Sequence, residues 1–146
     1  MTTTYTKYST DTGQIIGHVV SDNQDLLTLN THGQSYVEGY FDQDQYYIVD
    51  GHVENKANKP DNSHVIYDFD YNTKTWIVDL EQTKKQIRML RNTWLSVVDR
   101  INPVWYASLT VEQQQELQAY RQALLDVPQQ TGFPTHTSWP AKPQWL

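Results

Sequence analysis

The sequence contains no cysteine and only six glycines among its 146 residues. The absence of cysteine excludes disulfides, thiolate zinc sites and thiol catalysis, and nothing else in the composition requires an oxidising compartment. The chain also lacks a P-loop, a GxGxxG fingerprint and a GxSxG elbow. Phosphate cradles and nucleophile elbows therefore have no sequence support, and no enzyme is predicted.

Basic residues and long apolar runs are scarce as well. Lys and Arg number 11 against 17 Asp and Glu, which gives a net charge of -6. Because nucleic-acid affinity comes largely from cations that neutralise phosphates, we expect neither DNA nor RNA as a partner. No window approaches the roughly 20 apolar residues of a membrane span, and the N-terminus lacks a signal-peptide pattern. We expect no membrane insertion, no export and a cytoplasmic setting.

Aromatic residues are what the chain has in quantity. It contains ten Tyr, five Trp and three Phe, although hydrophobic residues make up only 38%. The core must then be small and partly aromatic. Tyr and Trp join a large apolar body to a polar tip, which suits them to half-exposed positions and interfaces. The composition favours binding over catalysis.

Charge divides the chain in two. Residues 1–80 hold 12 acids and 4 Lys or Arg, whereas residues 81–146 hold 5 acids and 7 Lys or Arg. We therefore predict two modules, a β-rich module over residues 1–80 and a helical region over residues 81–146. Candidate strands in the first module are residues 15–20, 26–29, 36–40 and 46–49, separated by turn residues.

The strongest strand signal is a β-hairpin over residues 64–80. Tyr67 and Phe69 alternate with Asp68 and Asp70 before a polar turn at residues 72–74. A period of two places the acids on one face and the aromatics on the other, so one face is wet and the other packs. The module is predicted to be antiparallel.

From Leu80 onward the period becomes helical. The apolar residues recur every three, four or seven positions and are Leu80, Ile87, Leu90, Trp94, Val97 and Ile101. Thr83 is the only polar member of this stripe, and Asn102-Pro103 ends the helix. The stripe is expected to pack on the next helix; a seam that pairs with a partner's coiled coil is the alternative.

A second helix is predicted to begin at Thr110, which forms a capping box with Gln113. It should end near Leu125, ahead of Pro128, with a loop over residues 102–109 before it. The last sixteen residues contain three Pro and two Trp, which is typical of an extended, polyproline-like arm. The predicted fold class is thus α+β: an N-terminal antiparallel β module, a two-helix hairpin and an extended Pro/Trp-rich C-terminal arm.

Candidate catalytic and metal-binding groups are weak. The five histidines form no HExxH motif and no pair four residues apart. Asp42 and Asp44 resemble the start of a calcium loop that lacks its turn glycine and its terminal Glu. Asp68 and Asp70 read as the exposed side of a strand rather than a glycosidase pair. We predict no catalytic residue, no metal and no cofactor.

One cluster of aromatics leaves two interpretations open. They are Tyr36, Tyr40, Phe41, Tyr46 and Tyr47. Packing in the core of the β module is favoured, and a flat platform that stacks on a host surface glycan is the alternative.

The second half carries a series of motifs in a fixed order. They are Arg88-Met-Leu-Arg91-Asn92, Leu109-Thr110, Tyr120-Arg-Gln-Ala-Leu-Leu-Asp-Val-Pro128, Phe133-Pro134 and Trp139-Pro140-Ala-Lys-Pro143. In order and spacing this series resembles the phage tail assembly chaperone family over about residues 84–143. The ending is also similar to tail-fibre assembly proteins. One departure is Arg100, which follows Asp99 where the family usually has Trp.

The resemblance implies a non-enzymatic protein that binds a phage tail or tail-fibre protein, expected to be a trimeric fibre. It would assist folding, trimerisation or attachment in the host bacterial cytoplasm. The alternative is a minor tail or fibre-tip protein that stays in the virion tail and takes part in host recognition.

The partner-binding residues that the motifs imply lie throughout the second half. They are Arg88, Arg91, Asn92, Trp94, Tyr120, Arg121, Phe133, Trp139 and Pro140. The arginines are expected to pair with Asp99 and Asp126, while Tyr120 and Trp139 pack the arm on the helices. A purely internal scaffold is the alternative for each.

Overall fold

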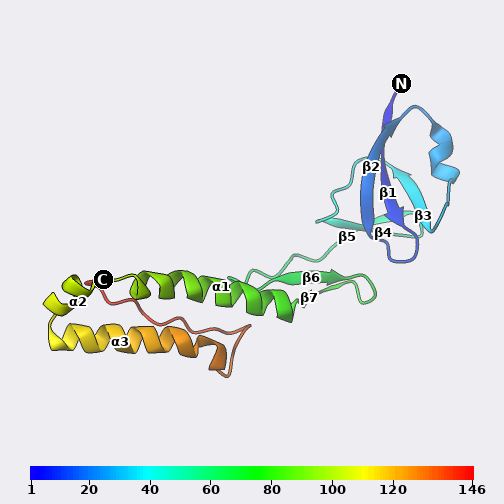
Figure 1. The fold of residues 1–146 in the computed structure, drawn as a ribbon. Coiled ribbons are helices and arrows are strands. Elements are labelled where there is room, and N and C mark those ends of the chain that lie inside the picture. Colours follow the sequence, from blue (N-terminus) through cyan, green and yellow to red (C-terminus); the bar gives the residue numbers. More distant parts are fainter. The chain divides into compact units, whose positions relative to one another are not determined.

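The computed structural model describes residues 1–146 and divides them into two compact units (Figure 1). The β unit comprises Met1–Pro60 and Asp68–Ile77, and the helical unit comprises Asp61–Tyr67 and Val78–Leu146. The connection at residues 61–67 therefore lies with the helices. The α+β class is confirmed.

The β unit contains two small antiparallel sheets. In the first, β1 (Thr3–Ser9) lies between β2 (Ile15–Ser21) and β3 (Gln34–Glu38). The second pairs β4 (Tyr46–Val49) with β5 (His52–Asn55). Short strands of this kind need a shared apolar side to be stable. That side buries Tyr8, Ile15 and Ile48, with Val37, Phe41, Tyr46 and Val53 packed around them.

Thr6 fixes the next segment of chain on the central strand. Its side chain is fully buried, and its hydroxyl donates to the Gly39 carbonyl at 2.8 Å and accepts from the Phe41 amide at 3.1 Å. Both sides of a buried hydroxyl are thereby satisfied. At the other end of β1, Gly13 allows the turn to lie against β4. Any residue with a Cβ at this position would collide with the Ile48 carbonyl oxygen.

Two strands were missed and one predicted strand is wrong. The sequence did not predict β1 or β5. Residues 26–29 were predicted to be a strand, but most of them lie in the 3-10 helix η1 (Gln24–Thr28). The Asn23 side chain accepts the Asp25 amide at 3.0 Å, and this cap starts a helical turn despite the apolar run that follows.

The predicted hairpin is confirmed as β6 (Tyr67–Asp70) and β7 (Thr75–Val78). Its turn is organised by Asp70, whose carboxylate accepts the Asn72 amide at 2.8 Å. A short Asp side chain that bonds to the backbone two residues ahead is a common turn-former.

Two lysines hold this hairpin within the β unit. Lys56 Nζ lies 4.6 Å from the Phe69 ring centre and donates to the Tyr71 hydroxyl at 3.0 Å. Lys74 Nζ donates to the Thr12 carbonyl at 2.9 Å. No residue of β6 or β7 is fully buried. Cation–π contacts and hydrogen bonds of the two lysine ammonium groups therefore hold the hairpin in place of a large apolar core.

In the helical unit, α1 (Leu80–Asp99) begins at Asp79, whose side chain accepts the Gln82 amide at 3.0 Å. The helix α3 (Val111–Asp126) begins with the predicted capping box, in which Thr110 and Gln113 bond to each other's amides. The two long helices are therefore confirmed.

The predicted loop between them is wrong, because residues Pro103–Ser108 form a short helix, α2. Asn102 accepts the Val104 amide at 2.8 Å, and Pro103 stands at the first helical turn, where no amide is needed. Asn102-Pro103 thus ends one helix and starts another.

The core of the helical unit is formed by Val98 of α1 and by Leu117, Tyr120 and Leu124 of α3. Partly buried side chains around it include Trp94, Leu95, Ile101, Tyr106, Leu109, Trp145 and Leu146. The predicted stripe is confirmed only in part: Trp94 and Ile101 pack against this core, whereas Leu80 and Val97 are about half exposed and Val98, outside the stripe, is buried in their place.

The C-terminal segment (residues 130–146) is not confirmed as an extended arm. The short 3-10 helix η2 (Val127–Gln129) precedes it, and the first part turns back on itself. The His136 amide donates to the Gly132 carbonyl at 2.6 Å, and the Phe133 amide donates to the Gln130 carbonyl at 3.1 Å. These bonds contradict a segment without internal hydrogen bonds.

Candidate partner-binding site

The C-terminal segment is tied to the helical unit by two tryptophans. The ring of Trp139 lies 4.6 Å from that of Trp94 in an edge-to-face arrangement, centre to centre, and 6.3 Å from that of His64. Trp145 donates its indole N–H to Glu116 of α3 at 2.7 Å. Edge-to-face aromatic pairs contribute beyond their buried area. Trp94 and Trp139 therefore make internal contacts. Pro140, which follows Trp139 in the chain, is half-buried.

The arginine pairing predicted from the sequence is correct for one residue and wrong for two. Arg121 Nε donates to Asp99 Oδ1 at 2.8 Å. Arg88 instead lies 5.6 Å from the ring centre of Phe133, and Arg91 donates to the side chain of Asn92 at 2.9 Å.

Asp126 accepts from the Gln122 side chain at 2.9 Å rather than from an arginine. Arg88 and Asn92 also line an open depression on α1, beside Lys85 and the exposed Met89.

Tyr120 belongs to the core, because only 8% of its surface is exposed. Loss of hydration raises the pKa of its hydroxyl above the ordinary value of 10.0. It positions α3 against α1, and its ring is not open to a partner in this conformation.

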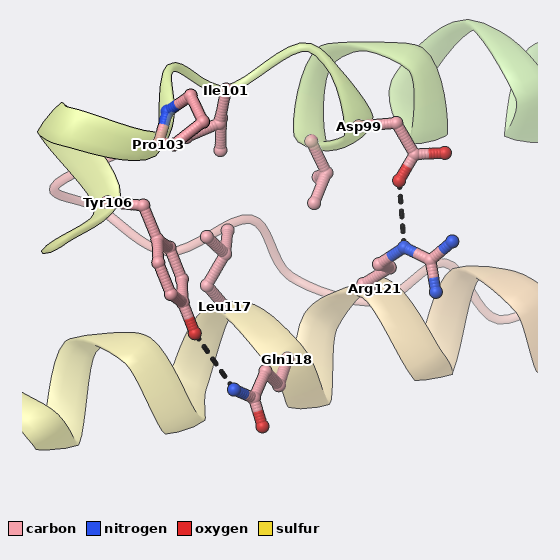
Figure 2. Close-up of a pocket in the computed structure, with 8 residues that line it drawn as sticks. Asp99, Ile101, Pro103, Tyr106, Leu117, Gln118 and Arg121 are labelled. Atoms are coloured by element: carbon pink, nitrogen blue, oxygen red, sulfur yellow. Dashed lines mark hydrogen bonds and ion pairs between the residues drawn. The ribbon is translucent and has the colours of Figure 1, made fainter.

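A hollow of about 350 Å³ opens where α1 ends, α2 turns and α3 passes (Figure 2). Its floor is apolar, and its polar groups stand at two opposite rims. The lining residues are Val98, Asp99, Ile101, Pro103, Tyr106, Leu117, Gln118 and Arg121. This volume lies at the small end of the range for ligand pockets, so it fits one large side chain.

The two rims are each closed by one contact, as Figure 2 shows. One rim is the Asp99–Arg121 ion pair, in which both side chains are nearly half exposed. At the other rim the Gln118 side chain donates to the Tyr106 hydroxyl at 2.8 Å. The hydroxyl proton of Tyr106 and the second carboxylate oxygen of Asp99 make no hydrogen bond with the protein. The hollow thus offers a donor and an acceptor around an apolar floor, with no net charge.

The helix α2, which supplies Pro103 and Tyr106 to the hollow, also carries exposed apolar side chains. The helix α2 has no buried residue, although its sequence is mostly apolar. Val104 is 81% exposed and Trp105 is 41% exposed. An uncovered apolar helix of this kind marks an interaction surface more often than a solvated one.

Most of the hollow was not predicted. Asp99 and Arg121 were paired correctly and Ile101 was placed on the helical stripe, but Pro103 and Tyr106 were assigned to a loop. The available signal was Asn102-Pro103 followed by three large residues, which is an N-cap, a first-turn proline and a helical apolar side. Gln118 carries no sequence signal, because its role depends on where Tyr106 is placed.

The acids considered for chemistry have local roles. Asp42 accepts the Asp44 amide at 2.8 Å, as a turn residue does. Asp68 is exposed on β6. No group of three His, Cys, Asp or Glu side chains is placed to hold a metal ion, and no helix is long and apolar enough to cross a membrane.

The aromatics considered for sugar stacking do not form one platform. Phe41 and Tyr46 pack against the core of the β unit and meet at an interplanar angle of 75°. Tyr47 contacts Phe69. Tyr40 alone is open, with 66% of its surface exposed.

The fold and the site together define a small α+β protein whose helical unit presents a hollow with an apolar floor and no net charge beside a largely exposed short helix. Residues 84–144 match the family model described as phage tail assembly chaperone protein. The resemblance predicted from the motifs is therefore confirmed over that segment. No curated protein and no solved structure shows a significant similarity to the chain.

Proposed function

We propose that this protein is a bacteriophage tail or tail-fibre assembly chaperone, which binds a tail or fibre protein and assists its folding, trimerisation or attachment. The observation that carries the proposal is the family match over residues 84–144. The matched segment includes most of α1, all of α2 and α3, and nearly all of the C-terminal segment, so it builds the hollow and its surroundings. No turnover or cofactor is proposed.

In the proposed mechanism, the protein covers exposed surface of its client until the client assembles. A fibre subunit that has not yet assembled exposes apolar side chains and unpaired strand edges, which lead to aggregation. A chaperone that covers some of this surface in the host cytoplasm lowers the population of aggregating subunits. Trimerisation then buries the same surface and displaces the chaperone. We propose a trimeric fibre protein as the client.

We further propose that residues 1–80 and 81–146 act as separate modules. Each structural unit has its own apolar core, one around Ile48 and one around Leu124. The helical module would bind the client, with Arg88, Arg91, Asn92 and Arg121 on its accessible surface. The β module would set the specificity or the orientation of the complex.

One observation favours a second candidate, a tail or fibre-tip protein that stays in the virion and contacts the host. On the β unit, the exposed Tyr40 stacks on the His18 ring at a centre-to-centre distance of 4.3 Å. A flat exposed aromatic pair offers a stacking surface for a sugar ring of a surface glycan, and it is much smaller than a five-ring platform.

The test of the proposed function is a phage in which codon 36, for Tyr36, is replaced by a stop codon. We expect tail or fibre protein to move from the soluble to the pelleted fraction of infected cells, and particles without complete tails in electron micrographs. Wild-type protein supplied from a plasmid should restore both. Normal solubility and normal tails in the absence of the protein would contradict the proposal.

A further inference from the structure

We infer that the hollow between α1, α2 and α3 is the place where the client docks, and that its occupant is one large aliphatic or aromatic side chain on an uncharged, extended segment. The inference rests on the proposed function for the identity of the client as a tail or fibre protein. The chemistry of the occupant comes from the hollow itself.

The size and lining of the hollow specify the side chain. Its floor is formed by Val98, Ile101 and Leu117, and its volume is about 350 Å³. Burial of a Leu or Phe side chain in such a place is favourable by about 1.5–3 kcal/mol, which corresponds to at least about tenfold in affinity. A small side chain would leave the floor in contact with water.

The charges specify the rest of the segment. The two charged residues that line the hollow, Asp99 and Arg121, neutralise each other at 2.8 Å. An acidic segment would find no free cation in the hollow, because Arg121 is already paired with Asp99. A basic segment would compete with Arg121 for Asp99. An uncharged segment meets neither cost.

The rims fit the peptide groups that flank a docked side chain. The Tyr106 hydroxyl proton is free to donate to a carbonyl, and the second oxygen of Asp99 is free to accept an amide N–H. Val104 and Trp105, between the lining residues Pro103 and Tyr106, add exposed apolar surface on α2. Its apolar floor distinguishes the hollow from the depression on α1, which is lined largely by charged and amide side chains.

The first experiment is an NMR titration of the full chain with N-acetyl-L-phenylalaninamide and, as a matched probe without a large side chain, N-acetyl-glycinamide. We expect saturable shifts of the Val98, Ile101 and Leu117 methyl signals with the first probe, and at least about tenfold weaker binding of the second. N-acetyl-L-phenylalanine, which adds a carboxylate, should bind no better than the amide. Equal binding of the glycine probe, tighter binding of the carboxylate, or shifts confined to other surfaces would overturn the inference.

The second experiment uses V104D, which adds a charge on α2 between the lining residues Pro103 and Tyr106. The control is V111D, which makes the same substitution at an exposed position of α3 outside both the hollow and the depression on α1. Neither should change the melting temperature by more than a few degrees, since both side chains are exposed. V104D should weaken co-purification with the tail or fibre protein from infected cells by at least about tenfold, and V111D should not.

If both variants bind the client like wild type and both restore tails to the stop-codon phage, the docking site lies elsewhere and the chaperone function stands. If the stop-codon phage itself makes normal tails, the proposed function fails independently of the hollow.

Discussion

At the scale of single residues, Thr83 shows how a polar side chain can be required inside a helical stripe. Its side chain is fully buried. The hydroxyl accepts the Ile66 amide at 3.0 Å and lies 3.4 Å from the Ile66 carbonyl oxygen, to which it donates. It thereby ties residues 61–67 to α1. The sequence marked Thr83 only as an exception to the stripe, because its partner lies 17 residues away in a connection.

We predict that Thr83→Val lowers the free energy of unfolding by about 1–3 kcal/mol, since the isosteric side chain leaves the Ile66 amide without a partner. Thr83→Ser retains the hydroxyl and is the control for the bond. Urea denaturation of the three proteins measures the difference. A valine variant as stable as wild type would show that water replaces the hydroxyl.

Tyr120 predicts a pH effect. Burial raises the pKa of its hydroxyl in the folded protein above the ordinary value of 10.0. The unfolded chain ionises this hydroxyl first, near pH 10, while the folded protein still keeps it neutral. The contribution of neutral Tyr120 to the free energy of unfolding is therefore fully present below pH 10. It is lost as the pH rises through the raised pKa of the folded protein. We expect wild type to lose more stability than Tyr120→Phe between pH 9 and about pH 11 in thermal melts. Parallel loss in both proteins would contradict the burial of this hydroxyl.

At the scale of elements, the sequence predicted those features that depend on hydrogen bonds between residues close together in the chain. The capping box at Thr110 and Gln113 was predicted because its bonds span three residues. The β1 strand was missed because its Thr-rich alternation becomes a buried face only when β2 and β3 flank it. The α2 helix was missed because Pro103 was taken only as a helix end. The hollow needs three elements at once, so only its ion pair was predictable.

The β2 strand gives an element-scale prediction. The only backbone hydrogen bonds of β2 are those with β1, so its outer edge is unpaired. None of its residues is a Lys, Arg, Asp or Glu. Val20 is 64% exposed. Natural edges are usually protected by a charge, so Val20→Lys should reduce self-association in sedimentation experiments at high concentration.

The same variant should change the free energy of unfolding by no more than about 0.5 kcal/mol, because Val20 is a surface position. If the wild-type protein self-associates and Val20→Lys associates to the same extent, the association uses another surface.

The C-terminal segment gives a second element-scale prediction. Trp145 and Leu146 pack on the helical core, and Trp139 packs on Trp94. Truncation after Pro128 should therefore lower the free energy of unfolding by about 1.5–3 kcal/mol, the order of the cost of exposing one large apolar side chain. It should also weaken client binding. An unchanged melting temperature with full client affinity would show that the segment is dispensable.

At the scale of the whole molecule, charge and structure divide the chain similarly but not identically. The β unit holds ten acids and four Lys or Arg, while the helical unit holds seven of each. The helical unit is thus close to neutral, and the excess of acids lies in the β unit. The proposed docking surface therefore lies on a unit with no net charge, while the net charge of the whole protein limits non-specific association.

The central claim is that this protein binds a tail or fibre protein during assembly and leaves before the particle is complete. Quantitative mass spectrometry of gradient-purified virions, compared with material that co-purifies with the tagged protein from infected cells, tests it most directly. We predict that the protein is absent from virions, or far below the copy number of the tail proteins, and that a tail or fibre protein co-purifies with it before lysis. Near-stoichiometric amounts in mature virions would contradict the chaperone account and favour a resident tail or fibre-tip protein.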